Sequence, residues 1–272
     1  MIGPAYARAT IRQMGRPTVT DSDLLQFRDD EDYAQLVDTE VHRFRGHRCK
    51  TDTRGHPAPH RGPFASLRVG GVTGDVVNTG IIPLWQRNMM LRYRFNGQSM
   101  LRMRNPERVM ARIRDLFAAA VGLWGDSAPI RFTERSDAPD FEFVVRNADD
   151  CDSTGCVLAA AFFPDHGQHS FVVYPEMFRQ DENEQVETMA HEIGHIFGLR
   201  HFFANVSETD APAQLFGTDS RFSIMNYGED SYLTPTDKTD LRTLYEEVWS
   251  GRRTDINRTP IRLMTPFSTD RV

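Results

Sequence analysis

The segment HEIGHIFGLRH, residues 191–201, spaces three histidines so that they can bind one metal ion. Residues four apart lie on the same face of an α-helix, so His191 and His195 can share the ion. Gly198 can end that helix, because glycine adopts the left-handed conformation at little cost, and His201 can then turn back toward the metal. Three neutral imidazoles with an open fourth position predict a catalytic zinc site, since structural zinc sites are closed by four protein ligands.

Glu192 stands beside the first histidine and is not needed as a ligand. Zinc lowers the pKa of a bound water toward about 7. Glu192 is placed to accept that proton as the water attacks a peptide carbonyl, and then to deliver it to the leaving amine. The alternative, an amphipathic helix with incidental histidines, does not account for Gly198 and His201 at these offsets.

The same segment matches the pattern H-E-x-x-H-x-x-G-x-x-H, and here the chain resembles the metzincin metallopeptidases. Downstream, SIMNYG at residues 223–228 resembles the metzincin Met-turn, which implies that Met225 forms an apolar floor beneath the imidazoles. Tyr227 is placed as in astacins and serralysins, which implies that its phenol stabilises the oxyanion; an ordinary pocket-wall aromatic is the alternative. Phe202, after the third histidine, matches none of the usual family choices, so the subfamily stays open.

Hydrophobic periodicity predicts the elements around this segment. A strand is expected at 91–95, where apolar residues alternate with arginines, and a helix should run from Pro106 to Trp124 with Asn105 as its N-cap. Further strands are expected at 130–132, 141–145, 157–163 and 170–174, and the metal helix should run from about Glu182 to Gly198. A last helix should begin at a capping box formed by Thr234 and Asp237 and end at Gly251.

These elements widen the resemblance. The strand at 91–95, the helix ending at Trp124 and residues 129–134 resemble the opening of a matrixin catalytic domain, and the likeness covers roughly residues 83–250. It implies an α+β zincin fold, with a twisted, mostly parallel sheet of about five strands and three helices. It also implies a zinc cleft between an upper and a lower subdomain.

Residues 157–164, VLAAAFFP, are similar to the matrixin edge strand that holds substrate. The resemblance implies that a peptide adds to this strand through main-chain hydrogen bonds and that Asn226 helps to wall a selectivity pocket beside the zinc. The alternative is a strand that is simply buried. The strand residues expected to bind substrate are Val157, Leu158, Ala159 and Ala160.

Three regions are expected along the chain: an N-terminal extension or pro-segment at 1–80, a metzincin catalytic domain at 81–251 and a polar C-terminal tail at 252–272. Cys49 lies in the first region, after Arg48 and before Asp52. In matrixins a pro-segment cysteine occupies the fourth zinc position, so the resemblance makes Cys49 a candidate cysteine switch. The family's glycine and proline are missing here, and a free cysteine is the alternative.

Composition narrows the class of protein. The chain has 272 residues, 39% hydrophobic and 26% charged, and its net charge of −6 gives no footprint for nucleic acid. No apolar run is long enough to span a membrane. We expect a monomer whose substrate is a peptide or a protein. The first residues lack the apolar core of a secretory signal, whereas the family resemblance implies secretion. Cys151 and Cys156 could close a short loop in an oxidising compartment.

A second metal site is not expected. His166 and His169 lie in a loop where matrixins carry structural zinc and calcium. The acidic residues that should follow are absent, so calcium is unsupported and both side chains are expected to be solvated loop histidines. The chain is therefore interpreted as an endopeptidase with one catalytic Zn²⁺. Two alternatives stay open: an inactive zincin-like module that binds peptide, and a zinc amidase that acts on non-protein substrates.

Overall fold

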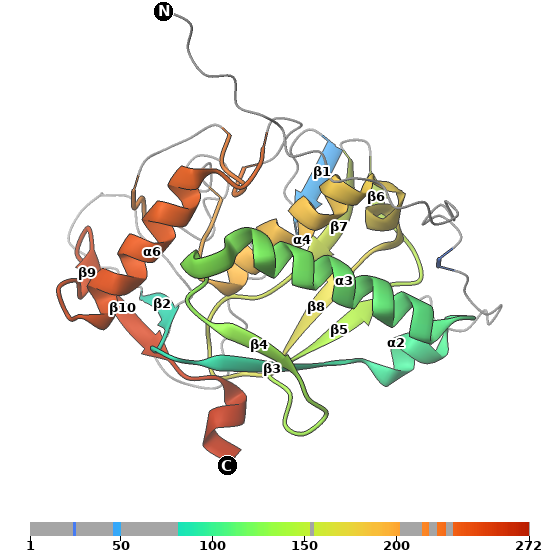
Figure 1. Cartoon of the computed structure of the whole chain (residues 1–272), viewed down its shortest axis with the longest axis horizontal. Helices are drawn as coiled ribbons and strands as arrows, with labels where there is room; N and C mark the ends of the chain where they lie inside the picture. The colour runs from blue at the N-terminus through green and yellow to red at the C-terminus, as the bar shows by residue number, and fades with distance from the viewer. Residues whose placement is uncertain are drawn as a thin grey trace, which may run out of the picture.

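The computed structural model describes residues 24–25, 46–49, 81–152, 155–201, 214–217, 222–226 and 231–271. The main sheet has the strand order β1-β7-β8-β5-β3-β4, and β6 pairs with the first half of β7 (Figure 1). The bounds are β1 (Gly46–Cys49), β3 (Met90–Phe95), β4 (Arg131–Glu134), β5 (Phe141–Val145), β6 (Asp150–Asp152), β7 (Gly155–Ala160) and β8 (His169–Val173).

Most neighbours in this sheet are parallel. The pairs β3–β4, β3–β5 and β5–β8 run parallel, and β7 runs antiparallel to β8. Every strand expected between residues 91 and 174 is present, with ends displaced by a few residues. The expected α+β architecture with a mostly parallel sheet is therefore confirmed, although among the described residues the sheet has seven strands where about five were expected.

Two long helices lie side by side on one face of the sheet (Figure 1). They are α3 (Pro106–Trp124) and α4 (Glu182–Ile196), and α4 carries the first two histidines. Phe117 of α3 packs edge-on against Phe143 of β5, with ring centroids 5.1 Å apart. At the end of α3, Trp124 packs in the same way against Phe197, 5.5 Å away, so aromatic contacts connect sheet, α3 and metal helix.

The helix ends follow the sequence closely. A capping box of Asp181 and Glu184 starts α4, and the predicted box of Thr234 and Asp237 starts α6 (Pro235–Trp249). Asn105 precedes α3 as predicted, but its side chain makes no capping hydrogen bond. The shorter helical segments are α2 (Gly97–Leu101), η2 (Gly125–Ser127), η3 (Pro175–Arg179) and η4 (Phe267–Arg271).

The polar tail expected at 252–272 was a wrong prediction. Residues 255–264 form β9 (Asp255–Ile256) and β10 (Thr259–Met264), and β10 pairs in parallel with β2 (Ile82–Trp85) in a second, small sheet beside α6 (Figure 1). In β10 the two end residues, Thr259 and Met264, are buried and the four between them are not, so its sequence reads as polar. Burial at the ends alone leaves no alternating pattern to recognise.

The strand expected to present a free edge to substrate is already paired. In β7, residues 155–157 and 159 lie in parallel register with Gly46–Cys49 of β1. The side that the resemblance assigned to a peptide is therefore covered by the chain's own N-terminal region. Most of residues 1–80 lies outside the described residues, although Leu24 is buried in the main core.

None of the helices in the described part of the chain is long and apolar enough to cross a bilayer.

Candidate metal centre and active site

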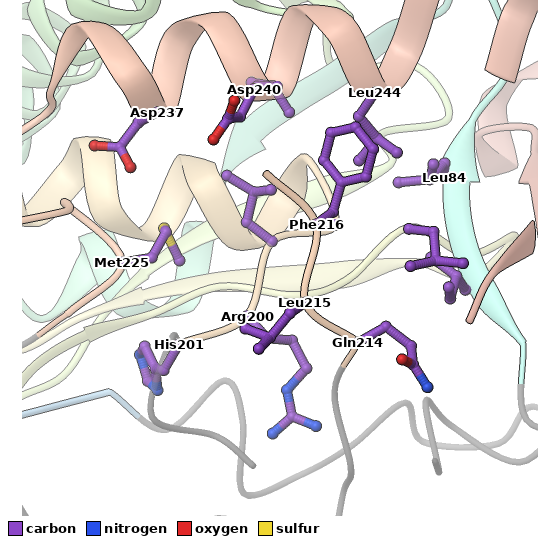
Figure 2. Close-up of a pocket in the computed structure, with 15 residues that line it drawn as sticks. Leu84, Arg200, His201, Gln214, Leu215, Phe216, Met225, Asp237, Asp240 and Leu244 are labelled. Carbon is purple, nitrogen blue, oxygen red and sulfur yellow. The ribbon is translucent and has the colours of Figure 1, made fainter. Parts of the chain in front are cut away.

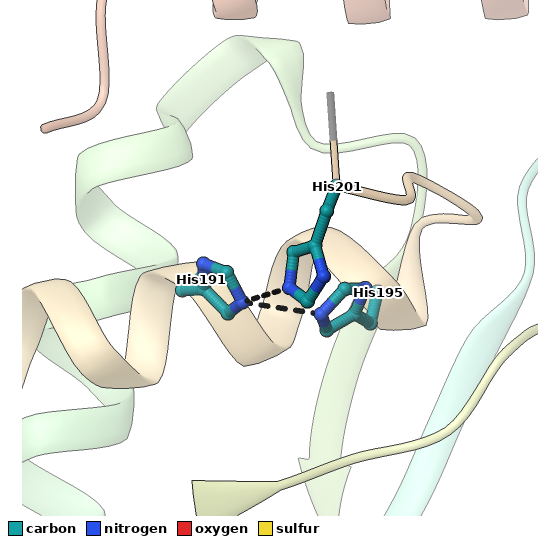
Figure 3. Close-up of side chains that lie close together, drawn as sticks. All are labelled: His191, His195 and His201. Atoms are coloured by element: carbon teal, nitrogen blue, oxygen red, sulfur yellow. Dashed lines mark hydrogen bonds between the residues drawn. The ribbon is translucent and has the colours of Figure 1, made fainter. Parts of the chain in front are cut away.

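Three imidazoles converge at the C-terminal half of α4 (Figure 3). The Nε2 atom of His191 lies 3.0 Å from Nε2 of His201 and 3.2 Å from Nε2 of His195. All three side chains are buried, with exposed fractions of 8% or less. Within the described ranges, this is the one group of three or more histidine, cysteine or acidic side chains that could hold a metal ion.

The hydrogen bonds on the far side of two rings fix which nitrogen faces the centre. Nδ1 of His191 lies 2.6 Å from the carbonyl oxygen of Ile224, and Nδ1 of His195 lies 2.8 Å from that of Leu199. A carbonyl only accepts, so each Nδ1 carries the proton and each neutral ring directs the lone pair of Nε2 inward.

The donor set fits zinc. Tetrahedral zinc with Zn–N bonds of about 2.0–2.1 Å holds its nitrogens roughly 3.3 Å apart, close to the separations found here. Neutral imidazoles packed this closely repel through their lone pairs unless a cation or a shared proton lies between them. The geometry is therefore that of a three-histidine zinc site.

Glu192 follows the first ligand on α4 and is 2% exposed. Nearby, the indole of Trp124 donates a 3.0 Å hydrogen bond to the carbonyl of Ala190, which ties the middle of the metal helix to the end of α3. A buried carboxylate beside a metal ion interacts with it strongly, because little solvent screens the charges.

Met225 packs against the metal helix opposite Gly194. A side chain at Gly194 would overlap the thioether sulfur of Met225, so glycine at this position allows the close approach. The residue before Met225, Ile224, accepts the hydrogen bond from His191. The segment 222–226 thus touches the metal helix through both a side chain and a backbone carbonyl.

Asp237, at the start of α6, holds this segment in place. Its carboxylate accepts hydrogen bonds from the Ser223 hydroxyl at 2.5 Å and the Ile224 amide at 3.3 Å, while Thr234 donates to it twice at 2.8 Å. The sequence predicted Asp237 only as a capping residue. Its second role depends on a contact between segments fourteen residues apart, which no local pattern reveals.

The strand β7 leads directly to the metal centre. Phe163, just beyond its end, packs edge-on against the imidazole of His195 with ring centroids 5.5 Å apart. Val157, Leu158, Ala159 and Ala160 are all buried in the present arrangement. The last residue of β1, Cys49, lies in register with Ala159.

A pocket lies on the side of His201 that faces α6 (Figure 2). Asp240 and Leu244 extend toward it from α6, and Leu84 of β2 and Phe216 form further walls. The lining is mainly apolar, and Arg200 stands at its rim near the third histidine. The predicted pocket wall at Asn226 does not border this pocket; Asn226 is half-buried and donates from its amide to the carbonyl of Ser223 at 3.0 Å.

The loop histidines are engaged by protein groups. Nε2 of His169 lies 2.6 Å from Asp165, with both side chains largely buried, and the His169 ring stacks on Phe162. Nδ1 of His166 lies 2.8 Å from the carbonyl of Thr265. The expectation that these are solvated loop histidines was therefore wrong for His169, because Phe162 covers its ring.

Two further features bear on the site. Cys151 and Cys156 form a disulfide at the β6–β7 hairpin, where they are directly opposite each other. Tyr227 and Phe202 lie outside the described residues, so the oxyanion role of Tyr227 remains a prediction.

Comparisons with known proteins show which proteins this chain is similar to. Residues 84–208 match the sequence model of the family described as matrixin. Stromelysin-3 of Homo sapiens is 30% identical over 163 residues, which cover 56% of this chain and 30% of that protein. The chain thus spans less than a third of that curated relative. Two solved structures of myroilysin have TM-scores of 0.41 and 0.38 at 16% identity, covering 60% of this chain and 95% and 85% of theirs.

Proposed function

We propose that the protein is a zinc-dependent endopeptidase, because residues 84–208 match the matrixin family model and stromelysin-3 is 30% identical to part of the chain. The observation that carries the proposal is the convergence of three Nε2 atoms, on His191, His195 and His201, with the first two rings oriented by backbone carbonyls. Zinc held by these three nitrogens would supply Lewis-acid activation of a water molecule and of the scissile carbonyl.

Glu192 is the proposed general base. It accepts a proton from the attacking water as the new C–O bond forms, and it passes that proton to the amide nitrogen as the C–N bond breaks. Its burial supports this role, since a carboxylate shielded from solvent keeps its proton transfers within the site. Tyr227, two residues after Met225, is the proposed donor to the oxyanion of the tetrahedral intermediate.

Peptide or protein substrates would bind as an added strand on β7. The backbone of Val157, Leu158, Ala159 and Ala160 leads toward Phe163, which touches the His195 ring. Strand addition gives affinity through the main chain and little choice of sequence. Asn226 and the residues after it are proposed to wall a selectivity pocket beside the zinc, separate from the pocket that faces α6.

In this proposal the full chain is inactive until β1 is displaced from β7. Residues 46–49 pair with the substrate edge of β7, so a peptide has to displace β1 before it binds. Cys49 ends β1 opposite Ala159, and its thiolate is the proposed occupant of the fourth zinc position. Residues 1–80 would then act as an inhibitory pro-segment to the catalytic domain.

A secreted protein in an oxidising compartment is the proposed setting, and the Cys151–Cys156 disulfide supports it. The protein is proposed to act as a monomer with one catalytic zinc ion.

Cleavage of casein or gelatin, with and without a chelator, tests the proposal. Chelator-sensitive cleavage is expected. Zinc binding without any cleavage of protein or of a peptide library would favour a zincin-like binding module. Turnover confined to small amides would favour a zinc amidase.

A further inference from the structure

The turn between the metal helix and the third histidine is held by residues from outside it. It consists of four residues, Phe197, Gly198, Leu199 and Arg200. The indole Nε1 of Trp85 donates a 2.7 Å hydrogen bond to the carbonyl of Ile196, and the hydroxyl of Tyr245 donates a 2.9 Å bond to that of Phe197. Carbonyls at the end of a helix lack partners within it, so these two donors fill that need.

The strand β2 also lies directly against this turn. Gly198 has φ +90°, which disfavours any residue with a side chain. A Cβ atom there would come within 2.9 Å of Leu84 and 3.0 Å of the Pro83 carbonyl. The glycine of the metal motif is therefore needed for the contact with β2 as well as for the turn.

When it is held in this position, the turn orients the two histidines on either side of it, His195 and His201. The carbonyl of Leu199 accepts the 2.8 Å hydrogen bond from Nδ1 of His195, and His201 follows only two residues later. A displaced turn would change both the orientation of His195 and the approach of His201. Partners of this kind commonly contribute 10–100-fold to metal affinity.

The C-terminal segment holds β2 where the turn needs it. Residues 261–264 of β10 pair with the whole of β2, and the carbonyl of Met264 accepts from the Gln86 amide at 2.9 Å. The segment just after β10 is anchored as well, because Ser268 donates to the buried Asp140, which directly precedes β5, through its amide at 2.7 Å and its hydroxyl at 3.0 Å.

The α6 helix completes the support. The indole of Trp249 donates a 2.9 Å hydrogen bond to the carbonyl of Trp85, and the hydroxyl of Tyr245 accepts from the Trp85 amide at 3.3 Å. Burial raises the pKa of Tyr245, so its hydroxyl stays protonated and able to donate to Phe197.

We propose that Trp85 and Tyr245 are positioning residues for the metal centre, and that residues 259–264 act on zinc binding by holding Trp85. The inference rests on the proposed function, because it assumes that the three histidines bind zinc. It extends the functional unit beyond residues 84–208, to a segment about sixty residues past His201.

The test uses the full chain with Trp85→Phe and Tyr245→Phe, and it measures the zinc dissociation constant by competition with a chelator. Each variant is expected to bind zinc about 10-fold or more weakly. The absorption bands of the Co²⁺-substituted protein should shift, reporting altered ligand geometry. Tyr93→Phe, which removes a hydroxyl from a ring packed against Phe117, is the control and should leave both readouts unchanged.

A His201→Ala background separates positioning from a general structural effect. Because the turn orients His195 as well as His201, Tyr245→Phe should weaken zinc binding in both backgrounds, but by a smaller factor in His201→Ala than in the wild-type background. Equal losses in the two backgrounds would overturn the proposal, as would unchanged affinity in both Trp85→Phe and Tyr245→Phe. A wild-type chain that binds no zinc would instead overturn the proposed function.

Proline substitutions test β10 itself. Met264 faces β2 with its backbone, and by the alternation of a strand Arg262 does so too, whereas Leu263 faces away. Arg262→Pro should weaken zinc binding, and Leu263→Pro and Arg262→Ala should not. Identical zinc affinity in all three would contradict the role of β10. If Arg262→Pro does not fold, as judged by circular dichroism, the zinc affinities of Trp85→Phe and Tyr245→Phe decide whether the proposal holds.

Discussion

The hydroxyl of Ser223 donates a 2.5 Å hydrogen bond to the carboxylate of Asp237. This bond connects the first turn of α6 to the segment that carries Met225 and that orients the ring of His191 through the Ile224 carbonyl. The last helix of the domain therefore helps to orient the first histidine of the candidate metal centre.

Replacing Asp237 with alanine should destabilise the protein and weaken the metal site. The change leaves two buried hydroxyls, of Ser223 and Thr234, and two amide groups without their acceptor, so a loss of about 2–4 kcal/mol in the free energy of unfolding is expected. Urea unfolding of the zinc-free chain measures it. Glu246→Ala, an exposed acid on the same helix, should change stability by less than about 0.5 kcal/mol. Equal effects from the two changes would contradict the role given to Asp237.

Replacing His201 with alanine should abolish the stabilisation that zinc provides. A ligand present at 1,000 times its dissociation constant stabilises a protein by about 4 kcal/mol, and loss of one of three ligands should remove most of that. Thermal unfolding with zinc and with a chelator gives the difference. His166→Ala, which alters a loop histidine bonded to Thr265, should keep the full zinc effect. A zinc effect that survives His201→Ala would exclude this residue as a ligand.

Breaking the β1–β7 pairing should activate the full chain. Proline at both His47 and Arg48 removes backbone donors from β1. A loss of about 1.4 kcal/mol in pairing free energy raises the equilibrium constant for displacing β1 roughly tenfold. The kcat/KM for a peptide should rise by about that factor while zinc content stays at one per chain. Cys49→Ala separately tests the thiol and should also raise turnover. Unchanged turnover in both variants would show that residues 46–49 do not restrain the site.

Glu187 on the metal helix should give a defined pH dependence of stability. Burial, followed by the nearby charges of Asp181 and Glu184, raises its pKa above the ordinary value. Its folded-state pKa therefore exceeds its unfolded-state pKa. While Glu187 is protonated in both the folded and the unfolded state, it does not change the free energy of unfolding. As pH rises through the folded-state pKa, the free energy of unfolding falls.

Glu187→Gln removes that titration. The free energy of unfolding of the zinc-free variant, relative to wild type, should increase from about pH 4 to pH 7. Chemical denaturation at both pH values measures the change. Glu246→Gln, a change at an exposed position of α6, is the control. A difference that shrinks as pH rises would contradict the stated sign.

Much of the fold could be predicted because it follows local periodicity. The helix Pro106–Trp124 carries a regular apolar stripe, and Thr234 and Asp237 form a capping box visible in four residues. The three histidines could be predicted to meet for the same reason, since two share a helix face and Gly198 allows the third to return.

What could not be predicted depends on contacts between distant segments. The strand β10 is buried at only two positions, and it is stabilised by β2, which lies almost 180 residues earlier. The pairing of β1 with β7, and the second role of Asp237, arise in the same way. Local pattern cannot report which partner a short strand or a carboxylate will meet.

The central claim is that Glu192 moves the proton in a zinc-dependent hydrolysis of peptides. The most direct measurement is peptide cleavage by the zinc-loaded Glu192→Gln chain, in the background with proline at residues 47 and 48, with Glu187→Gln as the control on the same helix. Zinc content should remain at one per chain while cleavage falls by about 10²–10⁴-fold, and Glu187→Gln should stay active. Wild-type rates in zinc-loaded Glu192→Gln would contradict the account.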